Sequence, residues 1–215
     1  MRTTRPVLVT ACLAAVVTVA GLVYAFFQRP SGQSSDQGAA DANLICGTTV
    51  CQSVIGKGVG GDNVELLTGT GGGRIRVTGE SGNFIFEMTI AAAGAEVSGD
   101  KALECAPAAV SVCLVRGTRG SEVLGEALVR RNGAWERLQA TYLASGGYLG
   151  LFDANRDGTS DVVAVQLGCD GRCDQAFVQV FDPLGPEVRC TAPVASKDEA
   201  NVRPELAQLR ACAQS

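Results

Sequence analysis

Alternation of apolar and polar residues runs through most of the chain after Leu44, and it constrains the fold more than any other feature. The stretch NFIFEMTI places Phe84, Phe86, Met88 and Ile90 on one face, and RIRV and VSVCLV alternate in the same way. Each run is short and ends in glycine-rich sequence, which is typical of β-strands joined by tight turns. The pattern predicts a mainly β domain of about ten to twelve strands, either a β-sandwich or a partial propeller-like stack of hairpins.

Two local signals refine this prediction. Asn132 and Gly133 lie between two extendable arms, and both residues tolerate the positive φ of a type I′ turn, so they predict a β-hairpin. The tail NVRPELAQLRAC has Asn201 as a candidate cap, Pro204 in the first turn and apolar residues at helical spacing. We expect a short C-terminal helix there, tied to the sheet through Cys212.

The amino-terminal end predicts a membrane anchor. Residues 1–6 carry Arg2 and Arg5, and residues 7–27 form an uncharged apolar run. At about 1.5 Å per residue this run reaches the roughly 30 Å thickness of a hydrocarbon core, and it is longer than the apolar part of most cleaved signals. Residues 28–43 are small and polar, which is typical of a flexible linker. We therefore expect a transmembrane signal anchor with the N-terminus in the cytoplasm.

The rest of the chain, residues 44–215, is expected to form one extracytoplasmic β domain. A second interpretation of the N-terminal run remains open, because Thr18–Ala20 carries the small residues that a signal peptidase needs, and cleavage there would release a secreted protein. The chain holds 18 basic and 22 acidic residues, and two of the basic ones precede the apolar run. A net negative outer domain without a basic run excludes nucleic acid as a partner.

The cysteines support an oxidising compartment. One of the nine, Cys12, lies in the apolar run, and the other eight fall as four close couples. An even number of clustered cysteines outside the cytosol predicts disulfides, and we expect nearest neighbours to pair. Zinc binding is the alternative role for the clustered cysteines, but the chain contains no histidine and no pair of C-x-x-C units. The expected pairs are Cys46 with Cys51, Cys105 with Cys113, Cys169 with Cys173, and Cys190 with Cys212.

The loop DANRDGTSD concentrates oxygen ligands within nine residues. A hard cation such as calcium takes six to eight oxygens, and a loop supplies them from alternating positions around a sharp turn. Without a cation the carboxylates would repel one another. A plain acidic turn, in which Asp and Asn only hydrogen-bond the backbone, is the alternative. The predicted structural calcium ligands are Asp153, Asn155, Asp157, Asp161 and the carbonyl of Thr159.

The same stretch resembles a known repeat. The pattern strand, D-x-N-x-D-G-x-x-D, strand is similar to the calcium loop of FG-GAP or VCBS repeats in integrin-type β-propellers, and the resemblance covers residues 148–182. It implies that 149–152 enters the loop as a strand, 161–167 leaves it and 176–181 returns as a hairpin. It also implies that the loop residues bind calcium in a structural role. The chain carries one copy of the loop and is too short for seven full blades.

The residue inventory argues against an enzyme. Without histidine, the usual triads, histidine-ligated catalytic zinc and the common base near neutral pH are absent. We therefore expect a non-catalytic structural or interaction domain of the cell envelope, with an envelope protein or polysaccharide as partner. Two alternatives stay open. A ligand-binding module would show an exposed apolar patch around Trp135 or Tyr148, and a carboxylate-pair hydrolase would need a cleft with two suitably spaced acids.

Overall fold

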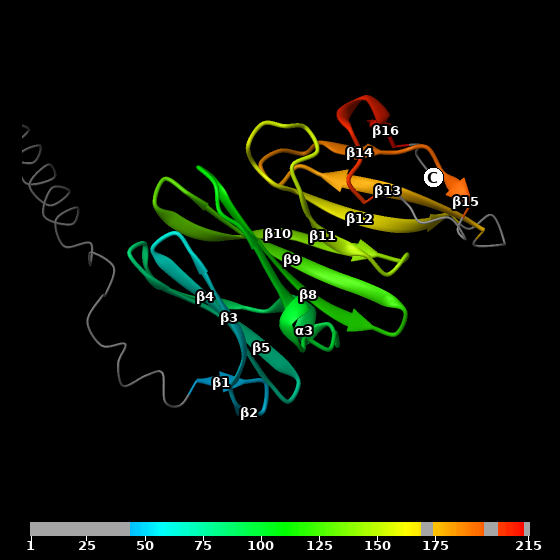
Figure 1. Cartoon of the computed structure of the whole chain (residues 1–215). Coiled ribbons are helices and arrows are strands. Elements are labelled where there is room, and N and C mark those ends of the chain that lie inside the picture. The colour runs from blue at the N-terminus through cyan, green and yellow to red at the C-terminus, as the bar shows by residue number, and fades with distance from the viewer. Residues whose placement is uncertain (1–43, 169–173, 196–201, 213–215) are drawn as a thin grey trace, which may run out of the picture. The chain divides into compact units, whose positions relative to one another are not determined.

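The fold is built from antiparallel strands that follow the alternating sequence runs. A computed structural model describes residues 44–168, 174–195 and 202–212 (Figure 1). These residues belong to one compact unit, Asn43–Ser215. Apolar side chains that recur at every second residue point to one side of a strand, so each run covers a core with one face. The predicted mainly β class is confirmed.

The first four-stranded sheet is a meander in which each strand pairs with the next along the chain. Its hairpins close through two-residue loops, because Gly69 pairs with Gly72 and Gly79 pairs with Gly82. A single helical turn, α3 (Thr89–Ala92), follows the sheet. The strands are β3 (Gln52–Val59), β4 (Asp62–Gly69), β5 (Gly72–Gly79) and β6 (Gly82–Glu87).

The second sheet is also a four-stranded meander, and a 3-10 turn, η2 (Asp100–Ala102), leads into it. Asn132 and Gly133 have φ angles of 54° and 76° at the tip of the longest hairpin, as the Asn-Gly signal predicts. The strands are β7 (Leu103–Ala106), β8 (Ser111–Arg119), β9 (Glu122–Arg131) and β10 (Ala134–Ala144).

The third sheet contains the DANRDGTSD loop and the C-terminal segment. Its strand order is β11-β12-β13-β14-β16, and β15 pairs with β13 beside this path. A separate two-stranded ribbon, β1 (Ile45–Cys46) and β2 (Thr49–Val50), precedes the first sheet. The strands of the third sheet are β11 (Leu149–Phe152), β12 (Asp161–Gly168), β13 (Gln175–Phe181), β14 (Val188–Cys190), β15 (Val194–Ala195) and β16 (Arg210–Ala211).

Buried side chains link the three sheets. One cluster joins the first sheet to one face of the second, where Ile75 and Leu128 are fully buried. Another joins the opposite face of the second sheet to the third, through Leu114 and Val162. A last cluster covers the far face of the third sheet, with Leu209 of the C-terminal segment packed on it. The second sheet is therefore buried on both faces, which explains why β8 and β9 contain nearly continuous apolar runs.

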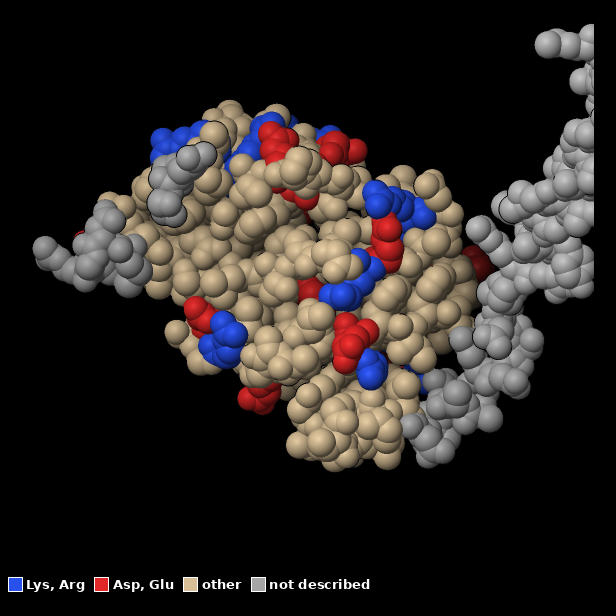
Figure 2. Space-filling model, turned by 180° about the vertical axis from the view of Figure 1, so that it is seen from behind, with Lys and Arg blue, Asp and Glu red and all other residues tan. Residues whose placement is uncertain are grey.

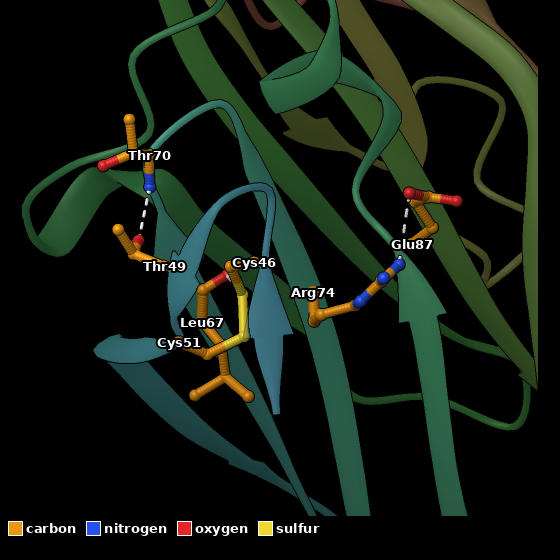
Figure 3. The surroundings of a disulfide bond; sticks show 7 residues. All are labelled: Cys46, Thr49, Cys51, Leu67, Thr70, Arg74 and Glu87. Atoms are coloured by element: carbon orange, nitrogen blue, oxygen red, sulfur yellow. Dashed lines mark hydrogen bonds and ion pairs between the residues drawn. A yellow bond between two sulfur atoms is a disulfide. The ribbon is translucent and has the colours of Figure 1, made fainter. Parts of the chain in front are cut away.

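Three disulfides are present in the described residues: Cys46–Cys51, Cys105–Cys113 and Cys190–Cys212. Each joins neighbouring cysteines, as predicted. Figure 3 shows the first of them against the sheet: the buried Cys46 lies beside Leu67, and its Sγ is 3.6 Å from the Leu67 carbonyl oxygen. The Thr70 amide donates to Thr49 Oγ1 at 2.8 Å nearby, so the ribbon is fixed to the β4–β5 hairpin. The expected Cys169–Cys173 pair lies outside the described residues.

The C-terminal helix prediction is wrong. The chain instead makes one 3-10 turn, η3 (Leu206–Gln208), whose Glu205 and Gln208 form a capping box, and then extends into β16. Cys190 lies in β14, and its disulfide to Cys212 holds the tail alongside that strand, where Cys190 pairs with Arg210. Pairing with a sheet edge thus replaces the local helical preference, which is weak in a segment this short.

Parts of the predicted organisation fall outside the described residues. These are the n-region 1–6, the transmembrane run 7–27 and the linker 28–43. Within the residues that are described, no helix has the length and apolarity to cross a membrane. The membrane anchor therefore stays a prediction from the sequence.

Candidate metal-binding loop

Two paired strands hold the ends of the DANRDGTSD loop together. Phe152, the last residue of β11, pairs with Asp161, the first residue of β12, so the loop spans the intervening residues. Arg156 and Gly158 have φ angles of 62° and 87°, which turn the backbone sharply twice within three residues. β11 matches the strand range that the repeat resemblance implies, and β12 and β13 match theirs to within one residue. The sequence therefore located both the loop and its supporting strands.

Side-chain oxygens of the loop accept hydrogen bonds from the loop's own backbone. Asp153 Oδ2 accepts from the Gly158 amide at 3.0 Å, and Asn155 Oδ1 accepts from the Asp157 amide at 2.9 Å. Asp157 Oδ1 accepts from the Thr159 amide at 2.7 Å. The Asn155 amide also donates to Asp157 Oδ2 at 2.9 Å. Hydrogen bonds between Asp or Asn side chains and nearby loop amides occur in both interpretations of the sequence.

Hydrogen bonds within the loop do not fully balance the burial of two carboxylate groups, those of Asp153 and Asp161. Asp153 Oδ1 is buried and has no hydrogen-bond partner, which is costly for a charged oxygen. Asp161 is only 3% exposed. Burial, together with the negative charges of Asp157 and Asp182, raises the pKa of Asp161 to about 6, although the Ala154 amide donates to Asp161 Oδ2 at 2.9 Å. The loop thus concentrates more negative charge than its own hydrogen bonds neutralise.

Asp182 is a participant that the sequence analysis missed. Val162 of β12 pairs with Phe181 of β13. Because the two strands are antiparallel, Asp161, just before Val162, and Asp182, just after Phe181, lie next to each other. The charge of Asp182 contributes to the raised pKa of Asp161. Its position was accessible from the sequence, because the predicted strand 176–181 ends immediately before Asp182. Antiparallel pairing of that strand with 161–167 brings the two acids together.

A hard cation such as calcium needs several oxygen ligands gathered in one place. Across residues 44–168, 174–195 and 202–212, no group of three or more His, Cys, Asp or Glu side chains is gathered closely enough to hold a metal ion. The unpartnered Asp153 Oδ1 and the high pKa of Asp161 nevertheless fit a site that a cation would complete. Asp153, Asn155, Asp157, Asp161 and the Thr159 carbonyl supply only oxygen, which suits calcium rather than zinc.

Trp135 is not an exposed ligand-binding residue. Its side chain is 3% exposed, and its Nε1 donates to Asp62 Oδ2 at 2.8 Å. Ser81 donates to both oxygens of Asp62 through its amide and hydroxyl, and Arg130 Nε lies 3.3 Å from Oδ2. Burial alone would raise the pKa of Asp62, but these hydrogen bonds and the Arg130 charge outweigh it and lower the pKa. This buried network connects the first sheet to the second.

Tyr148 lines a cavity of about 510 Å³ between the second and third sheets. Arg116 lies in the same cavity, with its Nη1 3.1 Å from Glu104 and its Nε donating to the Lys101 carbonyl at 2.9 Å. Burial, followed by the charge of Glu104, raises the pKa of Tyr148. Glu96 is the other acid in the lining. Because Glu104 is paired with Arg116, the cavity does not present two unpaired carboxylates.

Charges of both signs alternate across the surface. Figure 2 shows acidic and basic side chains next to each other on one face, with neutral surface between them. Exposed ion pairs of the described residues include Arg119–Glu122 and Arg189–Glu187. An alternating pattern gives no field of one sign over that face, in agreement with the absence of a basic run in the sequence.

Comparisons with protein-family models, with curated proteins and with solved structures found no match for this chain.

Proposed function

We propose that the protein is a membrane-anchored extracytoplasmic β domain with a structural calcium-binding loop, and that it has a non-catalytic interaction role in the cell envelope. Residues 7–27 anchor the chain, and residues 44–215 fold outside the membrane. Calcium binds Asp153, Asn155, Asp157, Asp161 and the Thr159 carbonyl. The observation that carries the calcium proposal is the unpartnered, buried Asp153 Oδ1 in a loop with a second buried carboxylate, Asp161.

Three further features support the proposal. The three neighbour disulfides suit an oxidising compartment, since such bonds are rare in the cytosol. The described residues form two four-stranded meanders and a six-stranded sheet, all antiparallel, and the loop lies between the first two strands of the six-stranded sheet. The only buried carboxylates outside the loop among the described residues, Asp62 and Glu126, accept hydrogen bonds from Ser81 and Thr89.

Thermal unfolding with and without calcium tests the calcium proposal. The full chain, with its disulfides intact in a mild detergent, is unfolded in excess chelator and then in calcium at about one hundred times Kd. A site present only in the native state adds about 2.7 kcal/mol under these conditions. For a domain of this size the midpoint should rise by about 5–10 °C.

Two variants separate a bound ion from a general salt effect. Asp157→Ala removes a proposed ligand and should abolish the calcium-dependent rise, whatever it does to the midpoint in chelator. Asp100→Ala removes an exposed acid in η2 and should keep the full rise. If the wild-type midpoint is the same in chelator and in millimolar calcium, the loop is an acidic turn and the calcium proposal is wrong.

A further inference from the structure

We propose that β6 is a dimerisation edge, at which two copies of this chain pair antiparallel about a twofold axis through Ile85. This inference is independent of the calcium proposal. It rests on β6 being a regular sheet edge with one exposed apolar side chain, Ile85, although part of β6 lies near β10. The partner at this edge is β6 of a second copy of the chain, because the backbone groups and side chains of two antiparallel β6 strands match each other.

The other long sheet edges in the described part of the chain carry features that block edge pairing. β3 has a register shift between Ser53 and Ile55 and a lysine at position 57. β10 has a register shift between Arg137 and Thr141 and two charged residues, Glu136 and Arg137. Bulges and charges are the usual devices that stop a sheet edge from pairing with another chain. β7 is covered by contacts with β3 and β11, and β16 has only two residues.

β6 lacks these devices. It pairs with β5 without a register shift over the whole of Gly82–Glu87, and its one charged residue is the last. Ile85 is 46% exposed on the outer face. Phe84 and Phe86 are half-buried on the other face, where their rings stack in parallel with centroids 6.1 Å apart. A regular edge with apolar groups on both faces favours pairing with another strand.

The backbone of β6 offers the correct hydrogen-bonding groups at its open side. The Met88 amide donates to the Gly73 carbonyl at 3.0 Å, so Met88 is bonded toward β5. In an antiparallel ladder the direction alternates along the strand, so Phe86 and Phe84 also bond toward β5. The amides and carbonyls of Asn83, Ile85 and Glu87 therefore point away from β5. Within residues 44–168, 174–195 and 202–212 these groups have no backbone partner on that side, so an added strand can pair with them.

A twofold axis through Ile85 matches these groups with each other. Ile85 then exchanges backbone hydrogen bonds with Ile85 of the second copy, and Asn83 does so with Glu87 of that copy. Glu87 forms an ion pair with Arg74 of its own chain at 3.2 Å (Figure 3). The proposed contact therefore places the Asn83 side-chain amide of one copy beside the Glu87 carboxylate of the other, whose charge Arg74 already balances. No like charges lie directly opposite each other. On the other face, Phe84 meets Phe86 of the second copy, which extends the observed ring stack.

Sedimentation equilibrium of the full chain tests this proposal. The disulfide-intact protein, in a detergent matched in density to the solvent, should show a monomer–dimer equilibrium. Ile85→Lys places a charge on the open edge and should raise the dimer dissociation constant at least tenfold, which is about 1.4 kcal/mol. Ile45→Lys is the control, because Ile45 is equally exposed, at 47%, but lies on β1. It should leave the dissociation constant unchanged.

Hydrogen exchange provides a second readout. The Asn83, Ile85 and Glu87 amides should be protected at high protein concentration and exchange quickly at low concentration, while the Phe84 and Phe86 amides stay protected in both. A wild-type protein that is monomeric at all concentrations overturns the proposal. So does a dimer that tolerates Ile85→Lys, which would place the contact elsewhere, for example in residues 7–27. Protection of these three amides that is independent of concentration would assign the edge to a segment of the same chain, and this also overturns it.

Discussion

At the scale of single residues, Asp62 contributes most clearly to the connection between two sheets. Its side chain is fully buried, yet it accepts hydrogen bonds from Ser81 and Trp135 and pairs with Arg130. Because Asp62 is in the first sheet and both Arg130 and Trp135 are in the second, one carboxylate fixes their relative position. Such a group stabilises a fold only while all its partners are present.

Asp62→Asn should destabilise the protein by about 2–4 kcal/mol at pH 7, because it leaves the Arg130 charge without its partner. The pKa of Asp62 is lower in the folded protein than its usual 3.8. The stabilisation is therefore present above pH 3.8 and is lost as the pH falls through the lower folded value. Urea unfolding of both proteins at several pH values measures this difference, which should shrink only below about pH 4.

An exposed ion pair provides the control for this prediction. Glu122→Gln breaks the Arg119–Glu122 pair, whose side chains are 48% and 37% exposed. Exposed pairs contribute little, so the free energy of unfolding should fall by less than about 1 kcal/mol. An equal loss in the two variants would mean that the buried network has no special role.

At the scale of elements, the sequence predicted strands and hairpins well where neighbouring residues determine them. The Asn132-Gly133 hairpin and the strands around DANRDGTSD depend on local turn chemistry and alternation, and both were correctly placed. The C-terminal segment was not, because its structure depends on a partner strand distant in sequence and on the Cys190–Cys212 bond. The Asp182 contribution to the loop was missed although the predicted strands contained it, because it emerges only when 161–167 and 176–181 are paired in register.

The disulfides should differ in their contribution to stability according to the loop that each closes. Cys190–Cys212 closes 22 residues and Cys46–Cys51 closes 5. In the chain-entropy model these loops are worth about 3 and about 2 kcal/mol. Urea unfolding should therefore show a larger loss for the double variant Cys190→Ala/Cys212→Ala than for Cys46→Ala/Cys51→Ala.

Loss of the longer bond should also have a local effect. Leu209 packs on the far face of the third sheet, and β16 pairs with β14 beside the bond. Limited proteolysis of the Cys190→Ala/Cys212→Ala variant should cut first within residues 202–212. Cleavage at the same sites and rates as in the wild type would show that strand pairing alone holds this segment.

At the scale of the whole molecule, the second sheet acts as a shared core. Leu128 packs toward the first sheet and Leu114 toward the third, and both are fully buried. Neither neighbouring sheet can keep its buried face if the second sheet opens. The three sheets should therefore unfold together.

Calorimetry of two variants measures this coupling. Leu128→Ala and Leu114→Ala should each cost about 2–5 kcal/mol, and each should keep a single transition with equal calorimetric and van't Hoff enthalpies. Val50→Ala is the control, since Val50 is 53% exposed on β2 and should cost much less. A second, separate transition in either core variant would show that the sheets unfold independently.

The order of the cysteines along the chain also bears on biosynthesis. Every described disulfide joins cysteines that follow each other in the sequence: 46 with 51, 105 with 113, and 190 with 212. Under the proposed topology the N-terminus stays inside and the chain beyond the anchor emerges in sequence order, so each pair is complete before the next begins to emerge. An oxidase that joins thiols in order of arrival then produces the native bonds directly. Maturation of this protein should therefore depend on an oxidase and proceed without a disulfide isomerase.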